Sequence, residues 1–136
     1  MSKKSDRRVI WLDRGWQPAF IGFCPSEAAW NHAMRHLGCA GEPYPDSAGR
    51  CSTFEKKDGI GGLTIIVTLG PAAEHATDLE IAGLLCHEAT HVWQFVRENM
   101  GETAPSKEFE AYSVQAIFQG LYGAFLGTRK SKAPDQ

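Results

Sequence analysis

The chain has 136 residues, of which 43% are hydrophobic and 22% are charged, as expected for one compact domain with an apolar core. Its 14 Lys and Arg nearly balance 16 Asp and Glu, and a net charge of -2 argues against nucleic acid or a membrane as a partner held by bulk charge. No apolar run approaches the ~20 residues that span a bilayer, and Val9–Leu12 is too short for a signal peptide, so we expect a cytoplasmic protein.

The first half of the chain alternates short apolar segments with turns. Two short strands are predicted over residues 9–12 and 20–23 because apolar residues cluster there between polar turns. Ser26 is a favourable N-cap, so a helix is expected to begin there and to end at Gly38. Glycines and prolines then predict a loop to residue 50.

The second half predicts two strands and two long helices. The run 63–69 is rich in β-branched residues and, with residues 51–56 and a glycine-rich turn between them, predicts a hairpin. Thr77 and Glu80 form a capping-box pattern that opens a helix ending near Gly101. A last helix is expected over residues 105–127.

These elements predict an α+β fold in one domain. The domain is expected to span residues 9–127, between a flexible N-terminus (1–8) and a flexible C-terminal tail (128–136). None of the four cysteines forms a C-x-x-C pair, so we expect reduced thiols that mostly fill the core.

The long helix that follows Thr77 contains His87-Glu88-Ala89-Thr90-His91. Two histidines four residues apart lie one turn apart on the same helix face, so both can bind one metal ion. Glu88 lies about 100° round the helix from His87, where it reaches a metal-bound water more readily than the metal. This arrangement predicts one Zn²⁺ ion with His87 and His91 as ligands and Glu88 as the catalytic base.

Other histidines have weaker patterns. His32 and His36 are also four residues apart, but no glutamate follows the first, and we interpret them as an exposed pair. His75 precedes the motif helix and is either a solvated loop residue or a hydrogen-bond donor to the transition state.

The sequence around these residues resembles the gluzincins, zinc peptidases in which H-E-x-x-H is followed by a second helix bearing E-x-x-A. Here Glu108 and Ala111 match that second pattern, but Tyr112 replaces the polar residue that supports a ligand histidine. The segments 86–94 and 110–115 are also similar to small metallopeptidase-like proteins of phages and prophages. The resemblance covers roughly residues 60–125.

The resemblance implies a minimal zincin-like domain, with a small, mostly antiparallel sheet packed on the active-site helix and on the C-terminal, glutamate-bearing helix. It implies Glu108 as the third zinc ligand, with Glu110 as the rival, and it makes strand 63–69 the edge that pairs with an extended substrate. Tyr112 and His75 are candidates for stabilising the transition state. We further expect one polar stripe of the last helix to face the metal: Glu108, Tyr112, Gln115 and Gln119.

The predicted function is zinc-dependent hydrolysis of a peptide bond in a peptide or protein substrate. The alternative is a metal-stabilised binding or assembly protein, associated with phages or prophages, that retains the site without catalysis. Glu88 favours the enzyme, because a structural zinc site has no need for an acid beside the first histidine.

Overall fold

The computed structural model describes residues 7–13, 15–55 and 62–132. The predicted flexible N-terminus lies outside the described residues except for positions 7 and 8, as does the end of the predicted C-terminal tail. The elements follow the order β1 (Ile10–Trp11), β2 (Ala19–Cys24), α1 (Glu27–His36), β3 (Gly49–Glu55), β4 (Leu63–Leu69), a short 3-10 turn η2 (Pro71–Ala73), α2 (Asp78–Asn99) and α3 (Lys107–Lys132).

The strands form one mixed sheet in the order β1-β2-β4-β3. β1 pairs antiparallel with β2, β3 pairs antiparallel with β4, and β2 runs parallel to β4 in the centre, with Ile21 opposite Ile65. The predicted α+β class is therefore confirmed, and two of the three pairings are antiparallel. The sequence pattern did not predict the parallel central pair.

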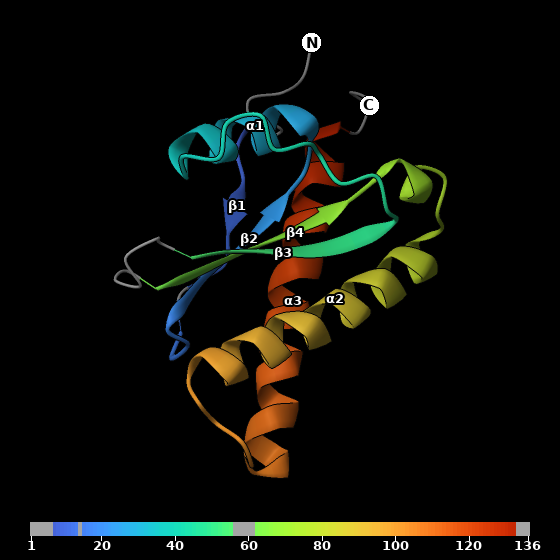
Figure 1. Ribbon diagram of the computed structural model, residues 1–136. Helices are drawn as coiled ribbons and strands as arrows, with labels where there is room; N and C mark the ends of the chain where they lie inside the picture. The colour runs from blue at the N-terminus through green and yellow to red at the C-terminus, as the bar shows by residue number, and fades with distance from the viewer. Residues whose placement is uncertain (1–6, 14, 56–61, 133–136) are drawn as a thin grey trace.

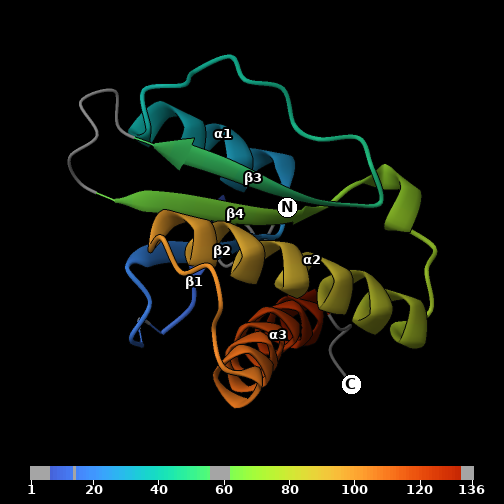
Figure 2. The same ribbon diagram turned by 60° about the horizontal axis from the view of Figure 1, so that its bottom comes forward.

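The two faces of the sheet are covered by different helices (Figures 1 and 2). α1 covers one face, where Trp30 and Met34 are buried with Ile66 of β4. α2 and α3 cover the other face, where alternate residues of the central strands enter the larger core. This alternation follows the two-residue period of a strand, which turns neighbouring side chains to opposite faces.

Two expectations were wrong. Strand 63–69 is not an edge: β4 is paired on both sides, and β3 forms the edge. This order arises because β2 pairs with β4 directly, which leaves the hairpin partner β3 outside.

The helix expected to end at Gly127 continues as α3 to Lys132. Thr128 is buried, and its hydroxyl donates a hydrogen bond to the carbonyl of Phe125 at 2.7 Å.

Neither of the two long helices, α2 and α3, carries an apolar stretch that could cross a bilayer, and neither does the other described helix.

Candidate functional site

Helix α2 carries the H-E-x-x-H motif and begins where the capping pattern predicts. Thr77 is its N-cap: the Thr77 hydroxyl accepts from the backbone N–H of Glu80 at 3.2 Å, and the Glu80 carboxylate accepts from the Thr77 N–H at 3.0 Å. The helix ends before Gly101, which has a φ of 72° in the left-handed region that favours glycine. These two ends fix the motif in the middle of a 22-residue helix.

The two histidines of the motif converge on one point. His87 is exposed, His91 is half-buried, and their Nε2 atoms lie 3.1 Å apart. Two ligands of a tetrahedral zinc ion, each at ~2.0–2.1 Å, are separated by roughly 3.3 Å. The pair therefore has a spacing suited to a single zinc ion.

Glu88 lies beside this pair, on the buried side of the helix. It is only 5% exposed and belongs to the stripe of α2 that packs into the protein. A Cβ placed on Gly49 would lie 3.6 Å from Glu88 Oε1, so the carboxylate rests against the start of β3. Sequence reasoning did not predict these neighbours, because no local pattern indicates which strand crosses a helix.

The surroundings of Glu88 alter its acidity. Burial raises the pKa of Glu88 above its ordinary value, while the neighbouring His87, His91 and Arg50 side chains oppose that shift. Burial, and secondarily the charge of Glu88, raises the pKa of the Cys51 thiol to about 12. A carboxyl group with a raised pKa beside a metal-bound water is suited to accept and return a proton near neutral pH.

A pocket of about 550 Å³ opens beside His87 and Glu88. Its walls come from η2 and the segment after it, the start of β3 and the first half of α2. They consist mostly of small residues: Ala48, Gly49, Ala72, Ala73, Ala76 and Gly83. A second pocket of about 550 Å³ lies between residues 50–54 of β3 and the segment 42–46, and it reaches Trp30 of α1 and Phe95 of α2. Both pockets share edge strand β3 as a wall.

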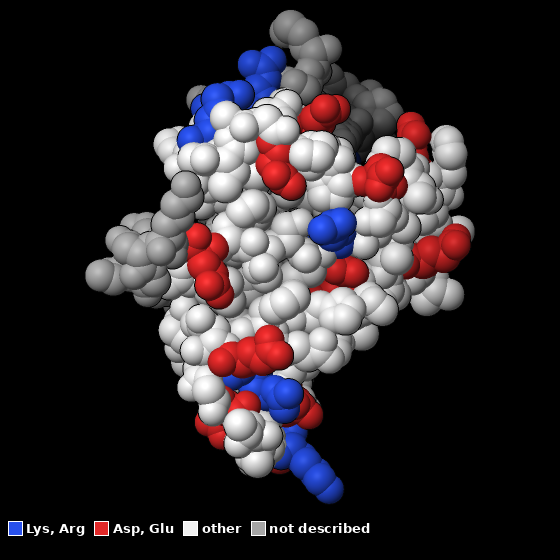
Figure 3. All heavy atoms as spheres, in the orientation of Figure 1, with Lys and Arg blue, Asp and Glu red and all other residues white. Residues whose placement is uncertain are grey.

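The surface around these pockets carries scattered charges of both signs (Figure 3). On the face shown, basic side chains gather over α1 and near the start of α3, and acidic side chains are spread around the face. A basic and an acidic side chain also lie in the middle, over β3 and α2, among uncharged ones.

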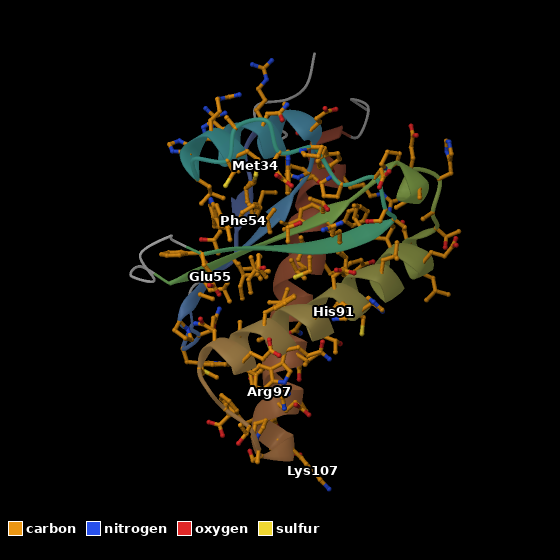
Figure 4. The ribbon with its side chains drawn as sticks, in the orientation of Figure 1. Met34, Phe54, Glu55, His91, Arg97 and Lys107 are labelled. Carbon is orange, nitrogen blue, oxygen red and sulfur yellow. The ribbon has the colours of Figure 1, made fainter. Side chains whose placement is uncertain are left out.

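The predicted third ligands, Glu108 and Glu110, do not lie beside the histidine pair. Glu108 and Glu110 are both exposed in the first turn of α3, and Glu110 Oε2 accepts a hydrogen bond from Trp93 Nε1 at 2.9 Å. Figure 4 shows Lys107, the neighbour of Glu108, at the tip of α3 and His91 midway along α2. Among the described residues, no three His, Cys, Asp or Glu side chains are grouped as a metal site.

The polar stripe of α3 faces solvent. Glu108, Tyr112, Gln115 and Gln119 are all exposed, and Tyr112 is 66% exposed. In the structure this stripe therefore does not face the histidine pair, because the apolar residues of α3 turn toward the sheet and α2. His75 is exposed in the loop before α2, and the small-residue pocket is lined by its neighbour Ala76 instead.

The second histidine pair and the cysteines agree with the expectations in part. The His32 and His36 rings lie 4.7 Å apart on the surface of α1. The cationic side chains of Arg8 and Arg35 are near them and disfavour a metal cation.

All four cysteines are free thiols, but Cys86 is exposed rather than in the core.

Comparisons with protein-family models, with curated proteins and with solved structures found no match to this chain.

Proposed function

We propose that this protein is a zinc-dependent hydrolase that cleaves peptide bonds. The observation that carries the proposal is the 3.1 Å separation of the His87 and His91 Nε2 atoms, with the buried carboxylate of Glu88 beside them on the same helix. A zinc ion bound by this pair would lower the pKa of a bound water toward ~7 and polarise a carbonyl oxygen.

Each residue then has a distinct task. His87 and His91 would hold the metal through Nε2. Glu88, held against Gly49 of β3, accepts the proton of the attacking water and passes it to the leaving nitrogen of the amide. Its burial matters, because it raises the pKa of the carboxyl group, and a general base works best when its pKa lies near the operating pH.

The third protein ligand is proposed on the resemblance to the gluzincins alone. Glu108 matches the first glutamate of E-x-x-A, although in the structure it lies in the exposed first turn of α3. The hydrogen bond from Trp93 occupies Glu110, which favours Glu108 over its rival.

Edge strand β3 is the proposed place of the substrate backbone. Among the described strands it pairs only with β4, and the second pocket, between it and the segment 42–46, would accept an extended peptide along its outer N–H and C=O groups. The small-residue pocket would then accept a substrate side chain next to His87 and Glu88.

Glu88→Gln tests the proposal, because this variant keeps the size of the side chain but removes the base. We expect the parent and the variant to bind one zinc ion per chain, and only the parent to cleave casein or a peptide library, with a loss of at least about 100-fold in the variant. Equal zinc binding with no cleavage by either protein would favour the alternative, a metal-stabilised binding or assembly protein. Absence of zinc from both would reject the metal site.

A further inference from the structure

We infer that Gln94 is a positioning residue that fixes the tautomer and the ring orientation of His91. Gln94 follows His91 by three residues on α2, and its Oε1 lies 2.9 Å from His91 Nδ1. An amide oxygen only accepts hydrogen bonds, so His91 Nδ1 carries the proton and its Nε2 carries the lone pair. The inference rests on the proposed function, in which this lone pair binds the metal.

The same contacts give the two histidines different tautomers. Because His91 Nε2 holds a lone pair, His87 must donate its own Nε2 proton across the 3.1 Å contact in the metal-free protein. His87 has to move that proton to Nδ1 before its Nε2 can bind a metal. His91 is therefore ready to bind a metal as folded, whereas His87 changes its tautomer upon metal binding.

A purely structural role for Gln94 is disfavoured by its position. The side chain is exposed, so it contributes little to the core, and its described hydrogen bond is made to the histidine ring. Hydrogen-bond partners of this kind raise the metal affinity of a histidine, and removing them typically lowers metal affinity by about 10- to 100-fold.

The first measurement uses the metal-free protein. Nitrogen-15 NMR of labelled histidine distinguishes a protonated Nδ1 from a protonated Nε2. We expect His91 to be protonated at Nδ1 in the parent and in Gln94→Glu, which keeps the acceptor, and to shift toward the Nε2-protonated form in Gln94→Met. An Nε2-protonated His91 in the parent would overturn the inference, whatever the protein does with zinc.

The second measurement is a zinc titration of the same proteins against a competing chelator. We expect Gln94→Met to bind zinc about 10- to 100-fold more weakly, and Gln94→Glu to bind at least as tightly as the parent, because a carboxylate partner raises the basicity of a ligand histidine. Gln115→Met, an exposed glutamine on α3, serves as the matched control and should change neither measurement. Unchanged zinc affinity in Gln94→Met would overturn the positioning role. A parent that binds no zinc would instead reject the proposed function, with the NMR result still deciding the tautomer.

Discussion

Trp93 donates a hydrogen bond from Nε1 to Glu110 Oε2 at 2.9 Å, joining the second half of α2 to the first turn of α3. Trp93 is almost completely buried, and its ring also packs edge-on against Phe109. Trp93 lies two residues after His91, about 200° round the helix. Glu110 is thus held on a different side of α2 from the histidine pair.

Through this hydrogen bond, Glu110 stabilises the folded protein. We expect Glu110→Ala to lower the free energy of unfolding by about 1–2 kcal/mol, because it leaves the buried indole N–H without its acceptor. Glu110→Gln retains an oxygen acceptor and should lose less. Urea denaturation followed by tryptophan fluorescence measures both values. Equal stability of parent and Glu110→Ala would show that water replaces the carboxylate without cost.

Zinc affinity separates Glu110 from Glu108. If Glu108 is the third ligand, Glu108→Gln should weaken zinc binding by at least about 10-fold, since the metal loses an anionic donor. Glu110→Gln should leave zinc affinity unchanged. A chelator-competition titration gives both constants. The opposite pattern would assign the third ligand to Glu110. If neither substitution changed zinc affinity, water or substrate would complete the coordination by the two histidines.

Gly83 is one turn before His87 and lines the small-residue pocket. A Cβ at Gly83 would meet no atom within 4 Å, so packing does not require glycine there. We expect Gly83→Ala to stabilise the protein by about 0.5–1 kcal/mol, because glycine is unfavourable inside a helix. Thermal unfolding monitored by circular dichroism checks this value.

A larger side chain at the same position tests the substrate pocket. Gly83→Leu should fold normally yet slow the cleavage of substrates with bulky side chains by at least about 10-fold, as misfit in a pocket does. Gly123→Leu is the control, since a Cβ at Gly123 of α3 also meets open space. Unchanged cleavage by Gly83→Leu would place the substrate elsewhere.

One buried and two half-buried acidic groups predict a loss of stability at alkaline pH. Burial raises the pKa of Cys24 from 9.0 to about 12, and that of Tyr44 from 10.0 to about 12; Cys51 is shifted likewise. The folded protein keeps these protons at pH values where the unfolded chain has lost them. Stability therefore falls as the pH rises above about 9 for the two cysteines and above about 10 for Tyr44, by up to about 1.4 kcal/mol per pH unit for each group.

Urea denaturation between pH 8 and pH 11 measures this slope. Cys24→Ala should make the decline shallower, because it removes one of the three groups. An unchanged slope in that variant would mean that Cys24 loses its proton equally easily in both states.

Local patterns predicted most elements but not their assembly. The capping box at Thr77 and the β-branched run 63–69 were identified correctly because helix ends and strand propensity depend on neighbouring residues. The order β1-β2-β4-β3 was not predicted, since strand pairing joins segments far apart in the chain.

In the candidate site, too, local geometry could be predicted from the sequence and long-range contacts could not. The separation of His87 and His91 follows from helix geometry alone, whereas the neighbours of Glu88, Gly49 and Arg50, come from a strand nearly 40 residues earlier. The orientation of α3 also depends on tertiary packing. Its apolar residues, such as Leu121, outweigh the polar stripe and turn Glu108 outward.

The position of β3 has a consequence for the behaviour of the protein in solution. Its outer side has no partner among the described strands, and in a concentrated sample β3 of another molecule is one extended chain that could pair with it. If the proposed hydrolase is correct, two copies joined there would block the substrate strand beside Glu88. Self-association would then also inhibit the enzyme, and both effects would depend on concentration.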